Sequence, residues 1–473
     1  MSAATGNRPS DSFGSDAEVF MYGPPAFFDR SYTKQHSIAR DRMEELQLAA
    51  LALRFNQGLE QVAMVSKLAG RQGITRVSEF DDVVPLLFEH TMYKSYPLSL
   101  LERRQFVKLT SWVSKLTPLD LSAVDASECD SIDSWLAVLA DKAELQITYT
   151  SGTSGTMSFL PISRHDHRVR ARVNRQAYLQ TFGEPPSAVA LDEPVHLIGG
   201  ANRWHAVQAM RIEVACGQDA FTHLSPVRPS ADLLWLAARL RFAAARGDSA
   251  RVEVPAALLA RRGELEQAQA SDPAAVQAWI DGIADLQGQN VLWQVFPADI
   301  YGIAAARLDK GERWSFTPES RVVCQGGSKG RPLPPDWFET VQSFIEVGTV
   351  IQTYGMAELT GLSPLCSAGR YHIQPWVIPF VLDPETSKLL PRQGVQAGRF
   401  AFFDLATNSH WGGLMTGDEI ALDFDGPCEC GATTLHFSSQ IARLSEKRGG
   451  DDKISCTATP QAYEEAMDFL VGS

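Results

Sequence analysis

The chain has 473 residues, of which 44% are hydrophobic and 21% charged, so it is long enough to bury a large core. Its 43 Lys and Arg against 56 Asp and Glu give a net charge of −13 without a basic cluster, so nucleic-acid binding is not expected. No run of residues reaches membrane-spanning length, and residues 1–17, rich in Ser, Gly, Asp and Asn, predict a disordered start rather than a signal peptide. We therefore expect a cytoplasmic protein without a membrane partner, whose seven cysteines are reduced thiols.

The first ordered elements expected along the chain are helices. Apolar residues recur at helical spacing from Ser37 to Ala69, which predicts a helical region over residues 35–70. Asp232 to Arg246 and Pro273 to Leu286 are also helix-like, on either side of the charged, Ala-rich segment Arg261 to Gln269.

Short apolar runs that alternate with these helices predict strands of a parallel sheet covered by helices on both faces. They are Pro194 to Ile198, Asn290 to Val295, Arg321 to Cys324 and Thr349 to Thr353. From residue 377 onward the runs are broken by Pro, Gly and Asp, which predicts a smaller antiparallel or barrel-like part over about residues 377–440. These later runs are Val377 to Leu382, Gly398 to Phe403 and Glu419 to Phe424. The expected fold class is therefore α/β: a large body over residues 18–440 with mainly parallel sheets, and a short tail over residues 441–473.

The segment Tyr149 to Thr156 consists of small or hydroxylated residues after its Tyr and follows the apolar run Leu145 to Ile147. Glycines let backbone N–H groups approach an anion closely, and Ser and Thr hydroxyls add further donors. The segment therefore predicts a phosphate-binding loop, although it lacks the Gly-Lys-Ser/Thr ending of the Walker pattern. The alternative is a flexible Ser/Gly loop without a ligand.

Two later strands end in motifs that could complete a nucleotide site. Arg321 to Ser328 and Val350 to Glu358 both place a Gly at the carboxyl end of a buried strand, where open α/β sheets bind ligands. The second adds an aromatic ring, Tyr354, and a carboxylate, Glu358, of the kind that binds a hard metal ion. Gly413 to Ile420 places Asp418 in a predicted tight turn between apolar strands, where it could accept hydrogen bonds from two ribose hydroxyls.

In this order and spacing, the segments resemble the adenylate-forming superfamily of acyl-CoA and aryl-CoA synthetases, luciferases and adenylation domains. The resemblance extends from about residue 80 to residue 455. Tyr93 to Leu100, before the loop, and Cys428 to Gly431, after the Thr-Gly-Asp segment, are similar to phenylacetate-CoA ligases and to the acyl-protein synthetases of bacterial luminescence.

The resemblance implies roles for individual residues. Glu358 would bind Mg²⁺ and would be catalytic together with Thr150 and Thr153. The other ATP-binding residues would be Ser151, Gly152, Ser154, Gly155, Gly326, Gly327, Ser328, Tyr354, Gly355, Asp418 and Arg443.

The chain also departs from the family. The lysine that usually follows the phosphate loop is absent, so Mg²⁺ alone, or one of Arg164, His165 and His167, would have to neutralise the phosphates. Ala357 stands where the family usually has Thr. The C-terminal lid domain is expected to be largely missing, with Lys447 or Lys453 in the tail as candidates for its lysine or simply as solvated charges.

Two further sets of residues are candidate sites. The region that lines the acyl pocket in relatives predicts a substrate pocket, although a core histidine and an ordinary loop would explain it equally well; its residues are His196, Asn202, Arg203, Trp204 and His205. Three thiols and an imidazole form a possible ligand set for a structural Zn²⁺, the alternative being ordinary buried thiols and a surface histidine. That set is Cys366, His372, Cys428 and Cys430.

The function that the resemblance implies is ATP-dependent activation of a small carboxylic acid as an acyl adenylate, with release of pyrophosphate. The acyl group would then pass to a thiol or amine acceptor, such as CoA, a carrier protein, an amine or Cys456 of the chain itself, in small-molecule biosynthesis. The alternatives are an acyl- or aryl-CoA ligase with a minimal lid, and a homologue that binds a nucleotide or acyl group without catalysis.

Overall fold

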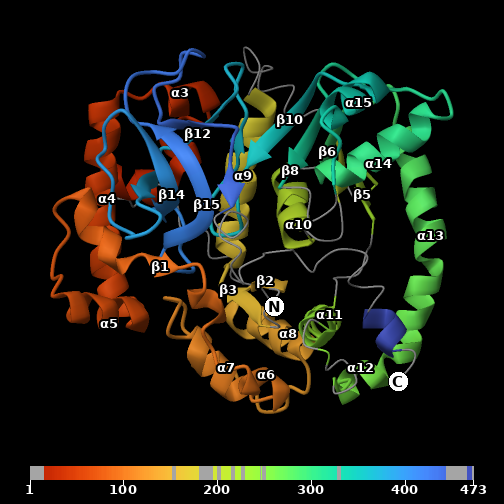
Figure 1. Cartoon of the computed structure of the whole chain (residues 1–473), viewed down its shortest axis with the longest axis horizontal. Coiled ribbons are helices and arrows are strands. Elements are labelled where there is room, and N and C mark those ends of the chain that lie inside the picture. Colours follow the sequence, from red (N-terminus) through yellow and green to blue (C-terminus); the bar gives the residue numbers. More distant parts are fainter. Residues whose placement is uncertain are drawn as a thin grey trace, which may run out of the picture.

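Two β-sheets and a helix between them form the centre of the protein (Figure 1). The computed structural model describes residues 15–151, 156–180, 195–199, 204–214, 219–224, 230–244, 247, 252–326, 332–443 and 466–470. The expected α/β class, with a mainly parallel sheet and a second, antiparallel sheet, is confirmed.

The first sheet has six strands in the order β11-β10-β8-β6-β4-β5, and all neighbouring strands are parallel except β10 and β11. Four of the strands lie where the sequence predicted them, and the apolar runs of β6 and β8 are buried on both faces of the sheet. The strands are β4 (His196–Gly199), β5 (Phe221–His223), β6 (Val291–Val295), β8 (Arg321–Gln325), β10 (Thr349–Tyr354) and β11 (Ser363–Pro364).

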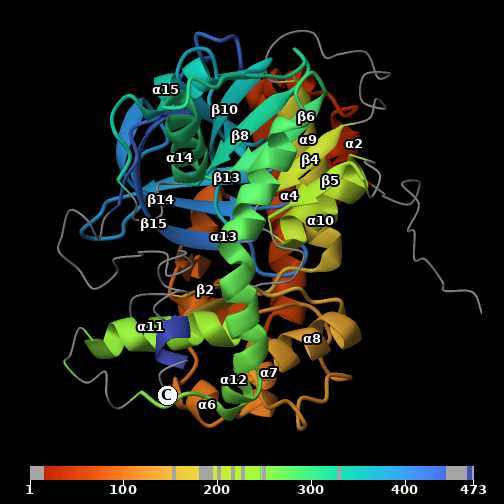
Figure 2. The ribbon, with the colours of Figure 1, turned by 90° about the vertical axis from the view of Figure 1, so that its right-hand side faces the viewer.

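Helices lie on both faces of this sheet (Figures 1 and 2). They are α9 (Arg164–Gln180), α10 (Trp204–Glu213), α13 (Arg262–Ala284), α14 (Pro297–Leu308) and α15 (Trp337–Phe344). A small parallel pair, β7 (Trp314–Ser315) and β9 (Ile345–Glu346), lies beside it. Helix α13 corrects one prediction: Arg261 to Gln269 does not separate two helices, because the helix runs from Arg262 through Pro273 to Ala284.

The second sheet has seven strands, mostly antiparallel, in the order β12-β16-β15-β14-β13 with β1 and β17 paired to β15. The strands are β1 (Phe88–Glu89), β12 (Arg370–His372), β13 (Val377–Leu382), β14 (Val395–Asp404), β15 (Gly413–Asp423), β16 (His436–Ser438) and β17 (Ala442–Arg443). The apolar face of the sheet packs against the N-terminal helices in one large core. These helices are α1 (Asp16–Tyr22), α2 (Pro24–Phe27), α4 (Arg40–Gln61) and α5 (Ala63–Gln72), whereas the short helix α3 (Tyr32–His36) packs against α9.

The predicted turn at Thr416-Gly417-Asp418 is wrong. The chain continues through it as the single strand β15, and the extra residues are accommodated in a β-bulge against β14, where Arg399 pairs with Glu419 but Ala401 pairs with Met415. A bulge of this kind redirects side chains without ending the strand.

The first described helix begins earlier than the sequence indicated. Helix α1 begins at Asp16, inside the segment predicted to be disordered, because Ser15 and Glu18 form a reciprocal capping box at its N-terminus.

A third layer of helices lies below the sheets in the view of Figure 1. It contains the 3-10 helices Phe80–Leu86 and Met92–Lys94, and the helices α6 (Ser99–Glu102), α7 (Phe106–Val113), α8 (Ile132–Ala143), α11 (Ala231–Ala244) and α12 (Ala256–Ala260), with the antiparallel hairpin of β2 (Thr148–Ser151) and β3 (Met157–Leu160).

Two of these helices cap each other. The Asp232 carboxylate, from α11, accepts hydrogen bonds from the first N–H groups of α8, at Ile132 and Asp133. In return, the Asp133 carboxylate accepts from the backbone N–H of Ala231 and the hydroxyl of Ser230. Because each carboxylate lies at the positive end of the other helix, the exchange fixes the angle between α8 and α11.

Helix α9 packs against both sheets. Its residues Val169 and Val173 are buried in the core of the second sheet, whereas Ala171, Ala177 and Tyr178 are buried against the first. The helix thus fixes the two sheets relative to each other, and Figure 1 shows it running between them.

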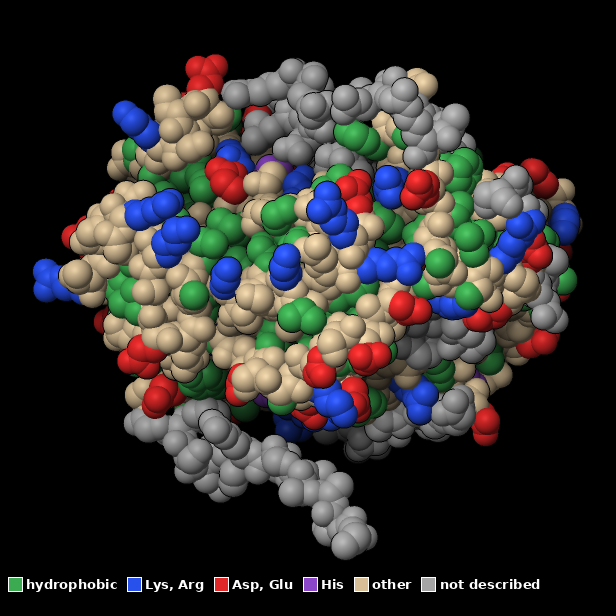
Figure 3. Space-filling model, turned by 90° about the horizontal axis from the view of Figure 1, so that it is seen from below, with side chains coloured by type: hydrophobic (Ala, Val, Ile, Leu, Met, Phe, Trp, Pro, Cys, Tyr) green, Lys and Arg blue, Asp and Glu red, His purple; other side chains and the backbone are tan. Residues whose placement is uncertain are grey.

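On the face drawn in Figure 3, Lys and Arg side chains are interspersed with Asp and Glu, so the described residues there present no continuous basic area. Within the described part of the chain, no helix combines the length and apolar character needed to cross a bilayer.

A helical segment near the C-terminus, residues 466–470, packs against the third layer (Figure 2). Ala466, Met467 and Leu470 are buried in one cluster with Leu236 of α11 and Leu258 of α12. This segment therefore closes an apolar surface that α11 and α12 would otherwise expose.

We predict that Leu470→Ala destabilises the protein by about 2–4 kcal/mol, because it removes a fully buried leucine from a packed cluster. The matched control is Asp468→Ala, on the exposed side of the same turn. Urea unfolding of both variants provides the measurement, and equal midpoints for Leu470→Ala and the wild type would contradict the packing described.

Candidate nucleotide and metal sites

Two segments far apart in the sequence meet where β10 ends. The hydroxyl of Tyr354, the last residue of β10, donates a hydrogen bond to the Asp418 carboxylate on β15, with Oη and Oδ2 3.0 Å apart. The ring of Tyr354 packs edge-on against Phe437, with centroids 5.0 Å apart. This contact joins the carboxyl end of the parallel sheet to the second sheet, at the kind of edge where open α/β sheets bind ligands.

The bulge in β15 determines where Asp418 lies. The Thr416 hydroxyl donates to Phe400 O (2.7 Å) and accepts from the N–H of Asp418 (3.1 Å), so the strand is held on both sides of Gly417. The Arg399 guanidinium donates to Thr416 O (2.6 Å) and pairs with Glu89 (2.7 Å). These bonds replace the ladder pairing that the bulge interrupts.

Arg443 lies opposite Asp418 in the second sheet. In β17 its backbone is the register partner of Asp418, and its side chain lies outside the described atoms.

Glu358 lies in the loop that follows β10 and is half-buried. Burial raises the pKa of its carboxyl above the usual range; Arg170 opposes this rise in pKa, and the Asp418 carboxylate adds to it. The structure therefore brings Glu358, Tyr354 and Asp418 into one region, with Arg170 as an additional charged neighbour that the sequence did not indicate.

The predicted phosphate loop connects β2 and β3, which pair from Thr148 with Leu160 to Ser151 with Met157. Thr150 and Ser151 belong to β2, and only their backbone is described. Gly152, Thr153, Ser154 and Gly155 lie outside the described residues. Gly326 directly follows β8 and has a φ of 72°, a left-handed conformation that glycine adopts without strain. Its predicted neighbours Gly327 and Ser328 lie outside the described part, and Gly355 follows Tyr354 directly.

A stripe of polar side chains on α9 makes a buried cluster that the sequence analysis did not predict. Asp166 accepts hydrogen bonds from the backbone N–H groups of Asn408 and Ser409 and from the hydroxyl of Thr407. One turn later, Arg170 donates to Ala357 O (2.7 Å), next to Glu358. Two signals could have indicated this stripe: the spacing of four residues between Asp166, Arg170 and Asn174, and the valines beside them.

The cluster extends to other elements. Arg54 of α4 donates to Leu405 O (3.0 Å) and to the Asn408 side chain (2.7 Å). Asp404 accepts from the N–H groups of Thr360 and Ala406. Segments around residues 357–360 and 404–409 are thus held to each other through buried charges.

None of the three proposed substitutes for the loop lysine is a buried cation. Arg164 is exposed and pairs with Glu144 at 3.4 Å, and His165 is exposed as well. Burial lowers the pKa of His167 to about 3, so this ring is neutral near pH 7. Arg170 is the charged residue that α9 buries beside Glu358.

The predicted substrate residues are only partly described. His205 of α10 lies against His167 of α9, with ring centroids 5.5 Å apart, and His196 is on β4. Trp204 begins α10, its side chain lies outside the described atoms, and Asn202 and Arg203 lie outside the described residues.

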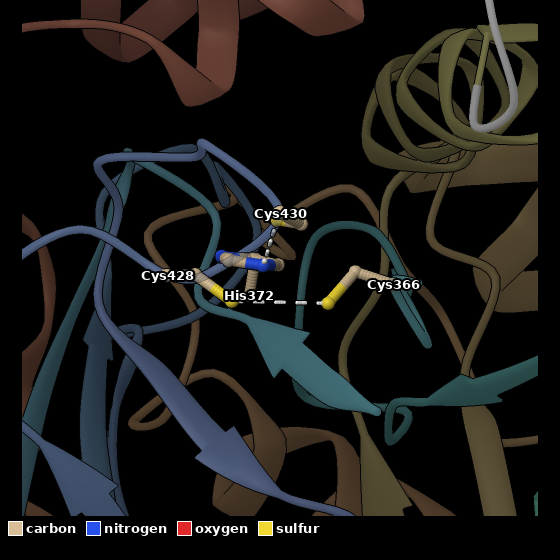
Figure 4. A group of neighbouring side chains, drawn as sticks. All are labelled: Cys366, His372, Cys428 and Cys430. Carbon is tan, nitrogen blue, oxygen red and sulfur yellow. Dashed lines mark hydrogen bonds between the residues drawn. The ribbon is translucent and has the colours of Figure 1, made fainter. Parts of the chain in front are cut away.

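The four predicted zinc ligands lie together, from two separate segments of the chain, and point toward one another (Figure 4). The ligand atoms of Cys366, His372, Cys428 and Cys430 all lie within 4.8 Å of one another. The Cys366 and Cys428 sulfurs are 4.0 Å apart, and Cys430 Sγ is 3.3 Å from His372 Nε2. Two sulfurs bound tetrahedrally to one zinc lie about 3.8 Å apart, so the set fits the ion in number, chemistry and spacing.

The groups around His372 also suit its role as a metal ligand. The Thr434 hydroxyl lies 3.3 Å from His372 Nδ1 and 2.8 Å from His36 Nδ1, which orients the ring with Nε2 toward the sulfurs. Burial lowers the pKa of His372 to about 4, which keeps the ring in the neutral form that binds metal. His372 is buried, so the alternative of a surface histidine does not hold.

No model of a known protein family and no curated protein matches the chain. Solved structures similar to it include 2-hydroxyisobutyryl-CoA ligase in complex with 2-HIB-AMP and CoA, with 13% identity and a TM-score of 0.46 over 87% of this chain and 71% of that one. ATP-bound MatB from Rhodopseudomonas palustris has 16% identity and a TM-score of 0.33 over 64% of this chain and 52% of that one. A red-emitting luciferase from Phrixothrix hirtus has 16% identity and a TM-score of 0.35 over 63% and 44%.

CoA ligases and luciferases are also the enzyme classes that the sequence resembles.

We predict that the four-residue cluster binds one equivalent of zinc. Removing the zinc with a chelator, or Cys428→Ser, should lower the melting temperature by several degrees, since the ligands join two structural segments. Cys129→Ser, which changes a free thiol outside the cluster, is the control. Metal analysis of protein purified without added zinc provides the direct measurement, and a metal-free, equally stable protein would contradict the prediction.

Proposed function

We propose that the protein activates a small carboxylic acid with ATP, forming an acyl adenylate and releasing pyrophosphate. The observation that carries this proposal is the hydrogen bond between Tyr354 and Asp418 beside Glu358, at the carboxyl end of a parallel strand. An aromatic ring, a carboxylate suited to ribose hydroxyls and a second carboxylate suited to a divalent cation are the groups that a nucleotide with its metal requires.

In this reaction the substrate carboxylate attacks the α-phosphorus of ATP and pyrophosphate leaves. The protein needs no nucleophile of its own for such a substitution, because positioning and charge stabilisation supply the rate enhancement. Asp418 would orient the ribose, and the backbone and hydroxyls between β2 and β3 would hold the phosphates. Glu358 would hold Mg²⁺, which neutralises phosphate charge when bound.

The acyl group would then pass to a thiol or amine. CoA is one candidate acceptor, since a similar structure contains it beside an adenylate, and a carrier protein or an amine is the alternative. The region around His196 and His205 is the proposed acid-binding pocket. The Cys366 cluster would hold a structural zinc, because four protein ligands leave no open position for catalysis.

Exchange of labelled pyrophosphate into ATP, measured with a panel of carboxylic acids, tests the proposal. Acid-dependent exchange is expected for at least one member. CoA consumption in the same reactions distinguishes a CoA ligase from an enzyme with another acceptor. Nucleotide binding without exchange for any acid would instead indicate a non-catalytic binding protein.

We predict that Glu358→Gln lowers the exchange rate by about a hundredfold while the protein stays folded, because the variant loses the charge that binds the cation. Glu346→Gln, at an exposed position on β9, should leave exchange unchanged. Exchange by Glu358→Gln at the wild-type rate would show that this carboxylate does not bind the metal.

A second variant tests the ribose contact. Tyr354→Phe removes only the hydroxyl that orients Asp418, so we expect the KM for ATP to rise about tenfold, as for the loss of one hydrogen bond worth about 1.4 kcal/mol. Tyr371→Phe, in the same aromatic cluster, is the control and should leave this KM unchanged. A KM in Tyr354→Phe equal to that of the control would remove the proposed role of Asp418.

A further inference from the structure

We propose that Arg170 is a positioning residue for Glu358, holding the backbone of its loop and supplying a positive charge near its carboxylate. The inference rests on the proposed function for what Glu358 does in the reaction. It adds a residue that neither the loop motif nor the resemblance assigns.

The first support is the contact with the loop backbone. Arg170 Nη1 lies 2.7 Å from Ala357 O, and this carbonyl belongs to the peptide group that joins Ala357 to Glu358. Fixing that peptide plane restricts the direction in which the Glu358 side chain leaves the backbone. A guanidinium on a rigid helix is well suited to this task, because its donors are held in one plane.

The second support comes from the N–H groups of Arg170 that form no hydrogen bond among the described residues. Arg170 Nε and Nη2 are buried and make no hydrogen bond to any described residue. Three carboxylates lie near enough to the guanidinium to raise its pKa, and two of them have their hydrogen bonds elsewhere: Asp166 with residues 407–409, and Asp404 with Thr360 and Ala406. The third is Glu358, whose side chain has no hydrogen bond to another described residue and whose pKa Arg170 lowers. Of the three carboxylates, Glu358 is therefore the one still able to receive the unused N–H groups.

The third support is that α9 holds the same loop at a second point. The N–H of Leu362 donates to the Asn174 side chain (2.9 Å), one turn beyond Arg170. Between the two contacts, Gly361 has φ of 104°, and a Cβ there would lie 2.6 Å from Val173 Cγ1. The loop is thus fitted closely to α9 over its length, so Arg170 acts on a segment whose position is already defined.

The test uses pyrophosphate exchange with the acid identified from the panel. Arg170→Met should lower kcat by about a hundredfold with little change in the KM for ATP, since the lost interaction is one of charge and alignment. Arg170→Lys keeps the charge but not the planar fork, and should lose about tenfold. Arg168→Met, exposed on the same helix, is the matched control and should behave as the wild type. In Arg170→Ala, added guanidinium at low millimolar concentration should restore part of kcat but none of the lost melting temperature.

A measurement independent of activity separates this inference from the proposed function. In a double-mutant cycle on the melting temperature, Arg170→Met should cost less in the Glu358→Gln background than in the wild type, because one uncompensated charge is then absent. Should Arg170→Met not fold, Arg170→Lys takes its place in the cycle. Equal costs in both backgrounds, or wild-type kcat in Arg170→Met, would overturn the inference. Absence of exchange in the wild type would instead overturn the proposed function and leave the cycle as the decisive test.

Discussion

Helix α9 is the element on which the rest of the structure depends, because it satisfies buried polar groups from both sheets. Its carboxylate Asp166 accepts backbone N–H groups of the loop before β15, and its guanidinium Arg170 donates to the loop after β10. Backbone groups left unpaired in such an interior would be costly, so the helix and the two loops stabilise one another. The same helix follows directly on the β2–β3 hairpin. A displacement of α9 would therefore move the β2–β3 hairpin and the Glu358 loop together.

The buried charges of this region are better explained by positioning than by stability. Replacing buried ion pairs with apolar residues is often neutral or stabilising, so a cluster of Arg54, Asp166, Arg170 and Asp404 is not needed to hold a core together. The cluster does fix the positions of irregular backbone, which apolar packing alone would leave less well defined. Glu358 lies at its half-buried edge, where a carboxylate can be held by the protein and still reach a ligand.

The sheets were largely predictable from the sequence, and the interactions between them were not. Strands such as β6 and β8 are buried on both faces and are therefore continuous apolar runs, which the sequence displays directly. The turn at Gly417-Asp418 was mispredicted because a bulge uses the same small and acidic residues as a turn, and only the pairing with β14 distinguishes them. The stripe on α9 was missed because charged residues on a helix usually face solvent. Its burial depends on loops more than 180 residues away in the sequence.

The cysteine cluster also affects how Glu358 and Asp418 are held relative to each other. Cys366 follows the loop that carries Glu358, and Cys428 follows the strand that carries Asp418, so a metal held by both would limit how far these two residues can separate. The hydrogen bond between Tyr354 and Asp418 spans the same two segments nearer to the ligand. Because α9 fixes the Glu358 loop and Arg399 fixes the bulge, the cluster need not contribute to the chemistry. Its effect would be to keep Glu358 and Asp418 at a constant distance, which the proposed positioning of a nucleotide requires.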